Sequence, residues 1–142
     1  MGLCKGCGLV QLINPFPAHE LRPKYDWVTY TEPEEHLDDL ADILARLPNM
    51  NKNASICGIS FKDDSLLERM KKHGFDKIMR LDLQLDLGAD STLGGVETVQ
   101  NLLNTARADS IVGKNGKFDL ILARHILEHT YDLYGFIAAL KR

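Results

Sequence analysis

A short apolar run decides the fold of this chain: Ala54-Ser55-Ile56-Cys57-Gly58-Ile59-Ser60-Phe61. Its length and its continuous apolar character are typical of a strand buried on both faces of a parallel sheet. Asp63 or Asp64 can cap a helix directly after the run, and Gly74 can close that helix with Phe75 behind it. The run therefore predicts the first strand and the first helix of an α/β unit.

The sequence after this unit continues to alternate between strand and helix patterns. A strand is predicted over residues 77–83, a helix around 96–106, a short strand at 110–112, and the clearest strand over 118–123, followed by helical sequence. Such alternation predicts an α/β fold with a parallel sheet, right-handed crossovers and helices on both faces.

Two segments precede the α/β unit. Residues 1–30 are rich in Gly and Pro, hold one predicted strand over Leu9–Ile13, and need a staple or a neighbour to be stable. Residues 31–52 predict a linking helix, because Thr31 and Glu34 fit a capping box and apolar residues then recur at spacings of three and four. We therefore predict three parts, with boundaries at 1–30, 31–52 and 53–142.

Composition excludes several classes of protein. The chain has 142 residues, 17 Lys and Arg against 20 Asp and Glu, and a net charge of −3, so no broad positive charge favours nucleic acid. No apolar run approaches the ~20 residues of a membrane span. Three cysteines argue against a disulfide framework, so we expect a cytoplasmic protein.

The motif Cys4-Lys5-Gly6-Cys7 has the spacing of two thiolates that bind one tetrahedral zinc ion. Cys57 lies in the predicted buried strand and is a poor further ligand, so the pair makes half a site. A redox role is the alternative, but no strand precedes the motif and no helix follows it to lower a thiol pKa.

The turn after the first strand is where doubly wound α/β folds bind nucleotide-like ligands. Only Gly58 stands there, and the absence of G-x-G-x-x-G disfavours a phosphate cradle. Asp82 sits at the end of the second predicted strand, 24 positions after Gly58, close to the ~20-residue offset of an acid that binds ribose hydroxyls. An Asp in this place can equally cap a turn or a helix.

The stretch His125-Ile126-Leu127-Glu128-His129 matches H-x-x-E-H, the inverted zinc-peptidase signature. On a helix both histidines would share one face, with Glu128 as the base. No Glu follows His129 to supply the further ligand. The alternative is a strand-to-helix turn in which Leu127 packs inward, and the sequence favours it.

Two of these blocks together resemble one family. The block from Cys4 to Leu12 resembles the second half of the N-terminal zinc-binding lobe of S-adenosylmethionine-dependent C-methyltransferases, which include enzymes that methylate deoxysugars. The block Phe118–His129 is similar to the fourth-strand motif of class I methyltransferases. The resemblance covers most of the chain in the family's order and implies a partial Rossmann-like methyltransferase domain.

The resemblance also implies roles for the cofactor-binding residues. Gly58 and the turn after it, including Ser60, would face the methionine part of S-adenosylmethionine. Asp82 would bind the ribose hydroxyls of the cofactor. Arg124 and His125, after the last strand, would border the cofactor and the substrate pocket.

For catalysis the resemblance implies methyl transfer to carbon in a small-molecule acceptor such as a sugar. His129 matches a family histidine proposed as the base, His125 lies beside the pocket, and Tyr25 falls in the segment that supplies a substrate-facing tyrosine. A base would deprotonate carbon, and the carbanion would attack the sulfonium methyl in line.

The resemblance further implies that this chain is incomplete at both ends. The first cysteine pair of the zinc lobe would precede Met1, and three strands of the sheet would follow Arg142. We therefore expect an exposed strand edge that can pair with a second copy. A non-catalytic binding or assembly module is the alternative function.

Overall fold

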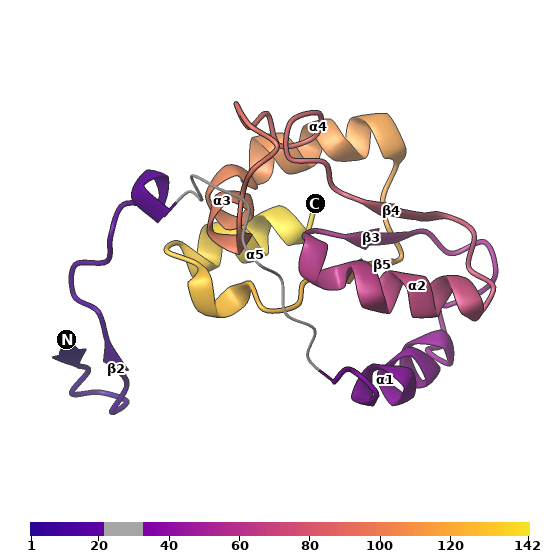
Figure 1. Ribbon diagram of the computed structural model, residues 1–142, viewed down its shortest axis with the longest axis horizontal. Helices are drawn as coiled ribbons and strands as arrows, with labels where there is room; N and C mark the ends of the chain where they lie inside the picture. Colours follow the sequence, from indigo (N-terminus) through magenta and orange to yellow (C-terminus); the bar gives the residue numbers. More distant parts are fainter. Residues whose placement is uncertain (22–32) are drawn as a thin grey trace.

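The computed structural model describes residues 1–21 and 33–142, and the chain is a mixed α/β protein, as predicted (Figure 1). An antiparallel hairpin of β1 (Gly2–Leu3) and β2 (Val10–Gln11) leads to the 3-10 helix η1 (Ala18–Leu21). The elements that follow are α1 (His36–Ala45), β3 (Ile56–Gly58), η2 (Phe61–Asp63), α2 (Asp64–Lys72), β4 (Ile78–Arg80), α3 (Val96–Leu102), α4 (Thr105–Asn115), β5 (Leu120–Leu122), η3 (Leu127–His129) and α5 (Leu133–Leu140).

The larger sheet is parallel, and its order within the described residues is β4-β3-β5. Cys57 of the central strand lies opposite Met79 on one side and Ile121 on the other. All residues of β3 are buried. The prediction of a parallel sheet with a fully buried first strand is therefore confirmed.

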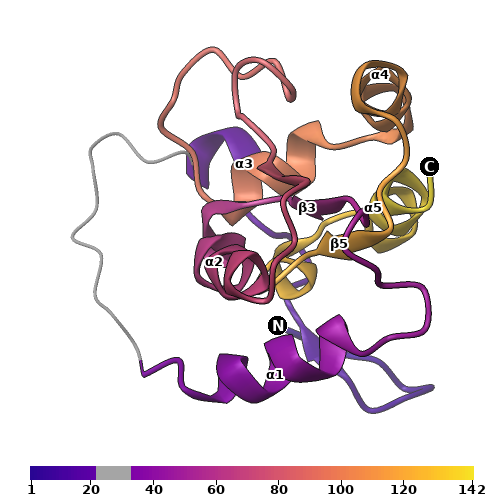
Figure 2. The same cartoon turned by 90° about the vertical axis from the view of Figure 1, so that its right-hand side faces the viewer.

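Helices cover both faces of this sheet. Successive side chains of a strand point in opposite directions, so each strand contributes residues to two cores. Ile56 and Leu122 belong to a core with α1 and α2. Cys57 belongs to a second core on the other face, which Ile121 joins and which α3, α4 and α5 complete. Figure 2 shows α2 on one side of the strands and α4 and α5 on the other.

The helix after β3 begins and ends close to the predicted residues. Ser60, rather than Asp63 or Asp64, caps the η2 turn that leads into α2: its hydroxyl accepts from the Lys62 amide at 3.2 Å. Gly74 takes the left-handed conformation (φ +84°), and its amide donates to Lys71 at 2.8 Å. The glycine stop is thus confirmed.

The predicted strand at 110–112 is wrong, because these residues lie in the helix α4. Ala108 and Ile111 are buried three positions apart, which suits one face of a helix. The Asn104 side chain accepts from the Arg107 amide at 3.0 Å and caps a new helix, so the predicted helix 96–106 divides into α3 and α4.

The segment after β5 forms a strand-to-helix turn, the alternative that the sequence favours over a helical H-x-x-E-H motif. A turn and η3 come first, and α5 begins only where Asp132 accepts from the Gly135 amide at 2.9 Å. Leu127 is 43% exposed, whereas Ile126 is fully buried. The expected inward packing of Leu127 is therefore wrong, and its neighbour takes that place.

The helix α1 packs onto the α/β unit. Leu37 and Ala41 are buried in the same core as Ile56. Thr31, of the predicted capping box, lies outside the described residues. The Glu34 carboxylate pairs with Arg124 Nη2 at 3.2 Å, and the capping box stays a prediction. The boundaries predicted at residues 30 and 52 stay a prediction.

We expect Gly58→Ala to destabilise the protein by about 1–3 kcal/mol, the usual cost of overpacking. A Cβ at this position would lie 2.7 Å from Leu67 Cδ1 and 2.9 Å from Asp63 Cβ, so α2 would have to move away from β3. Urea denaturation followed by circular dichroism measures the change. Gly113→Ala is the control: nothing lies within 4 Å of its added Cβ. In the helix α4 we expect it to stabilise by about 0.5–1 kcal/mol. Equal effects would contradict the argument.

Candidate functional site

The candidate site lies at the carboxyl ends of the strands. The chain passes from β3 to β4 on one side and then to β5 on the other side of β3. In open parallel sheets, ligands bind outside the carboxyl ends of the strands where the order reverses in this way. The residues that follow Gly58 and Leu122 therefore flank the position where a ligand is expected.

A buried carboxylate joins these two segments. Asp63 Oδ2 accepts from the amides of Ile59 and Ser60 at 3.0 and 2.9 Å, and its Oδ1 accepts from the amide of Arg124 at 2.9 Å. Burial raises the pKa of Asp63, and the three amide donors oppose that rise. The loop after β3 is thus held to the residue after β5 by one side chain.

Gly58 and Ser60 lie where the cofactor-binding prediction places them, at the end of β3. In the structure, both residues stabilise the local fold of the segment after β3. The missing Cβ of Gly58 lets Leu67 and Asp63 approach the strand, and the buried Ser60 hydroxyl caps η2. A ligand at this end of the strand would therefore meet backbone groups.

Asp82 lies in the exposed loop after β4, at the same edge of the sheet. Its Oδ1 accepts from the amides of Gln84 and Leu85 at 2.8 and 2.7 Å. Its own amide donates to Asp86 Oδ2 at 2.8 Å. The turn-capping role is therefore present, and the ribose-binding role stays a prediction.

Arg124 is predicted to border the cofactor, but its guanidinium turns toward the start of α2. It donates to the Lys62 carbonyl at 2.8 Å, to Ser65 Oγ at 3.1 Å and to Glu34 Oε1 at 3.2 Å. The hydrogen bond with Ser65, and then Arg124, lower the pKa of Glu34. Only the backbone of Arg124 lies at the point where the strand order reverses.

His125 and His129 are separated from each other by the turn after β5. His125 has a left-handed backbone (φ +52°), and its exposed Nδ1 is 3.7 Å from Glu128 Oε1. His129 ends η3, and its Nδ1 is 3.2 Å from Glu97 Oε1 on α3. The two histidines share no α-helical face, so the geometry expected of a zinc peptidase is absent.

Neither Asp63 nor Glu97 is among the predicted site residues. The pattern Ser60-x-x-Asp63 is a local signal, because it forms the capping box. Glu97 has no such signal, since it meets His129 only through the packing of α3 against η3. Tyr25 lies outside the described residues.

Cys4 and Cys7 occupy the turn of the hairpin. The Cys4 amide donates to Leu9 at 2.8 Å, and the Gly8 amide, in left-handed conformation (φ +75°), donates to Cys4 at 2.9 Å. Hydrogen bonds from the Cys7 and Gly6 amides, and then from the Cys7 side chain, lower the pKa of Cys4. Such donors stabilise a thiolate, the form that zinc binds. Within residues 1–21 and 33–142, no group of three or more His, Cys, Asp or Glu side chains could hold a metal ion.

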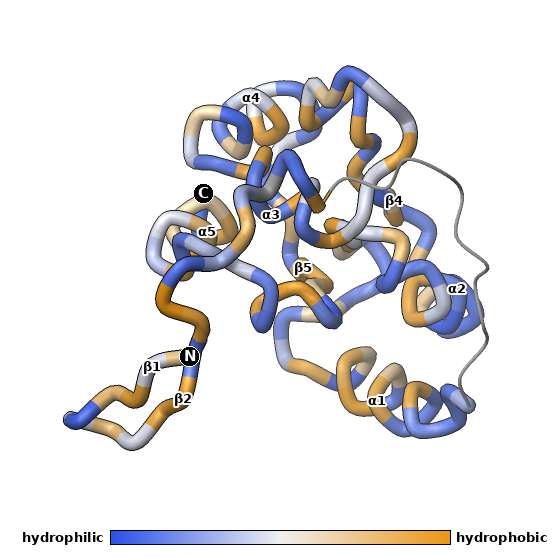
Figure 3. Tube along the Cα trace, turned by 60° about the vertical axis from the view of Figure 1, so that its left-hand side comes forward, coloured by the Kyte–Doolittle hydropathy of each residue, from blue (hydrophilic) through white to orange (hydrophobic). Residues whose placement is uncertain are grey.

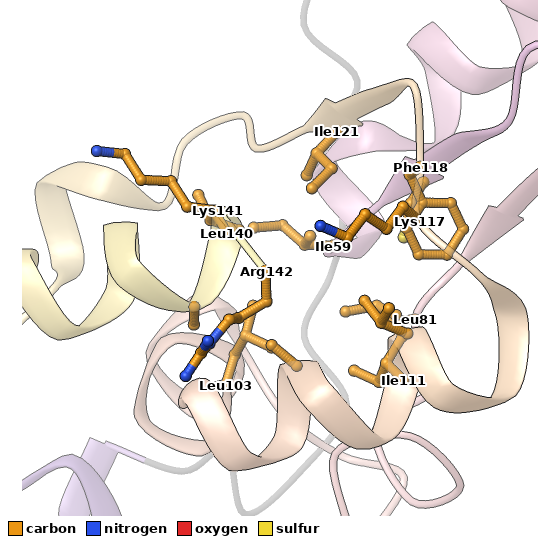
Figure 4. A pocket seen from close by; sticks show the side chains of 14 residues that line it. Ile59, Leu81, Leu103, Ile111, Lys117, Phe118, Ile121, Leu140, Lys141 and Arg142 are labelled. Carbon is orange, nitrogen blue, oxygen red and sulfur yellow. The ribbon is translucent and has the colours of Figure 1, made fainter.

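An apolar cavity of about 150 Å³ lies between the sheet and the helices α4 and α5 (Figure 4). The Lys117 amine points across it, whereas the Lys141 amine points away. Of the predicted site residues that the structure describes, none lines it. Cys57 does, and burial raises the pKa of this thiol to about 12.

Comparison with protein-family models, with curated proteins and with solved structures gives no match to this chain. Among the described residues, no helix has the length and apolar character needed to cross a membrane. The motifs and the geometry of the strand ends are therefore what points to a function.

We expect Asp63→Asn to destabilise the protein by about 1.5–3 kcal/mol, because an amide nitrogen would replace one acceptor that faces backbone N–H groups. Urea denaturation measures this loss. Asp64→Asn is the control, since Asp64 is 54% exposed and pairs with Arg80 at 3.1 Å. That change should cost less than about 1 kcal/mol. Equal losses for the two variants would show that Asp63 does not join the segments as described.

We expect the three cysteines to separate by reactivity. In metal-free, reduced protein, Cys4 and Cys7 are exposed and should react rapidly with a disulfide reagent at pH 8. Cys57 is buried with a raised pKa, so it should react only after denaturation. Absorbance counts the thiols released before and after guanidinium is added, and a third rapid thiol would contradict the burial of Cys57.

Proposed function

We propose that this chain binds S-adenosylmethionine at the carboxyl edge of its sheet and serves methyl transfer to a carbon of a small molecule. The observation that carries the proposal is the strand order β4-β3-β5. It brings the turn after Gly58 and the loop of Asp82 to the ends of neighbouring strands. A class I methyltransferase domain, which the motifs resemble, would use these positions for its cofactor.

The chemistry of the cofactor suits the donors at this edge. S-adenosylmethionine contains no phosphate, so a turn with one glycine and no G-x-G-x-x-G pattern is compatible with it. Asp82 would accept from the ribose hydroxyls through the oxygen that does not hold the turn. The segment Ile59–Ser60, fixed by Asp63, would present backbone groups to the methionine part.

The cofactor would supply an electrophilic methyl on its sulfonium. Of the chain's own residues, we propose His129 as the base that takes the proton from carbon. Glu97, 3.2 Å from His129 Nδ1, would orient the imidazole and stabilise its protonated form. His125, exposed beside the end of β5, would contact the acceptor. Tyr25 is proposed for the acceptor site on the resemblance alone.

A non-catalytic assembly module is the second candidate. The observation that favours it is the edge position of β5, which has β3 on one side only within the described residues. An open edge can pair with a second copy of the chain. We assign either function to a reducing compartment such as the cytoplasm, because the cysteines are free.

Isothermal titration with S-adenosylhomocysteine, the product of methyl transfer, tests cofactor binding. We expect saturable heat with the wild-type chain, and at least a tenfold weaker affinity for Asp82→Asn, which keeps the turn acceptor but removes the charge. Asp76→Asn is the matched control, because it makes the same charge change just before β4, at the opposite end of that strand.

Three results decide the matter. Heat that is weakened by Asp82→Asn and unchanged by Asp76→Asn supports the assignment of the edge. Equal affinities for both variants would remove Asp82 from the site. A wild-type chain that gives no heat at millimolar ligand would reject cofactor binding and leave the assembly module.

A further inference from the structure

The N-terminal hairpin has several large apolar side chains that are exposed to solvent. Figures 1 and 3 show β1 and β2 standing apart from the sheet and its helices. Its large apolar side chains, together with that of Phe16 just after it, are between 55 and 67% exposed: Leu3, Leu9, Val10, Leu12, Ile13 and Phe16. Several large apolar side chains exposed within one short segment favour an interaction surface.

The apolar side chains are ordered by the pairing of the strands. Leu3 and Val10 are partners across the hairpin, so their side chains lie on one face. Leu12, two residues after Val10, extends that face. The hairpin therefore offers a small apolar face beside the turn that holds Cys4 and Cys7.

The turn itself offers half of a metal site. Cys4 and Cys7 lie in the same turn, three positions apart, and both are exposed. A structural zinc ion takes four ligands in a tetrahedron. Since no group of three potential ligands exists in the described part of the chain, a zinc ion on Cys4 and Cys7 would need its other ligands from outside these residues.

We propose that two copies of this chain join their hairpins around one zinc ion, each copy supplying Cys4 and Cys7. A two-fold axis through the ion relates identical donor pairs, which is the geometry of an isologous dimer. The same axis lets the apolar face of Leu3 and Val10 in one copy cover its counterpart. Four thiolates around Zn²⁺ leave a net negative charge, and Lys5 of each copy follows Cys4 in the same turn.

The test uses the full chain with a non-thiol reductant, so that disulfides cannot form. Zinc is added, excess metal is removed by gel filtration, and zinc content and molar mass are measured by elemental analysis and light scattering. We expect one zinc per two chains and a doubled mass, both reversed by a chelator. Co²⁺ in place of zinc should give the absorption of a tetrahedral thiolate site.

Substitutions separate the metal from the apolar face. Cys4→Ser and Cys7→Ser, each checked for folding by circular dichroism, should lose both zinc and dimer. Cys57→Ala, a change of the buried third cysteine, should keep both. The double variant Leu3→Gln/Val10→Gln keeps all four thiolates, and we expect its dimer dissociation constant to rise by about tenfold or more.

The proposal is overturned by a monomer that holds one zinc per chain, by a chain that retains no zinc, or by a dimer that persists in Cys4→Ser. The titration with S-adenosylhomocysteine is independent of these results, because it reports on the strand ends and not on the hairpin.

Discussion

The carboxylate of Asp63 fixes the end of the sheet on which every proposal for cofactor binding depends. It joins the amides of Ile59 and Ser60 to that of Arg124, 61 residues further along the chain. Burying a carboxylate is unfavourable unless donors replace water, and three aligned N–H groups do so here. Without this side chain, the loops after β3 and β5 would each have to find their own hydrogen-bond partners. At the point where the strand order reverses, a polar contact therefore joins the two loops.

Arg124 extends this link to α1. Its backbone donates to Asp63, while its guanidinium reaches Glu34. Arg69 adds a second tie, with Nε 2.6 Å from Asp38 Oδ1 and Nη2 3.1 Å from the Glu34 carbonyl. Arg124 is expected to face the cofactor, but its guanidinium is hydrogen-bonded to other groups of the protein. Asp82 and His125 are exposed at this edge, so their side chains stay available to a ligand there.

The sequence predicts elements whose signals are local. The strand β3 and the stop at Gly74 follow from an apolar run and from a residue that tolerates positive φ. Part of the helix α4 is predicted as a strand, because the three residues 110–112 are too few to show a helical or a strand period. The cap at Asn104 and the packing of Ala108 in the second core show that the segment is helical. The bonds from Asp63 to Arg124 and from Glu97 to His129 join distant segments, so no local pattern contains them. Likewise, no local pattern predicts the left-handed backbone of His125 (φ +52°).

The hairpin poses a different physical problem from the α/β unit. Strands of two residues do not form a stable ribbon in water by themselves, and this one has its apolar side chains exposed. The residues after it are held to the body by η1, which packs on α3, and by the Tyr131 hydroxyl, which donates to the Phe16 carbonyl at 2.6 Å. These contacts anchor the base of the hairpin and leave its turn uncovered. A shared metal ion would constrain the turn directly, and a second copy would cover the apolar face. One assembly would therefore both hold the turn and bury the exposed apolar side chains.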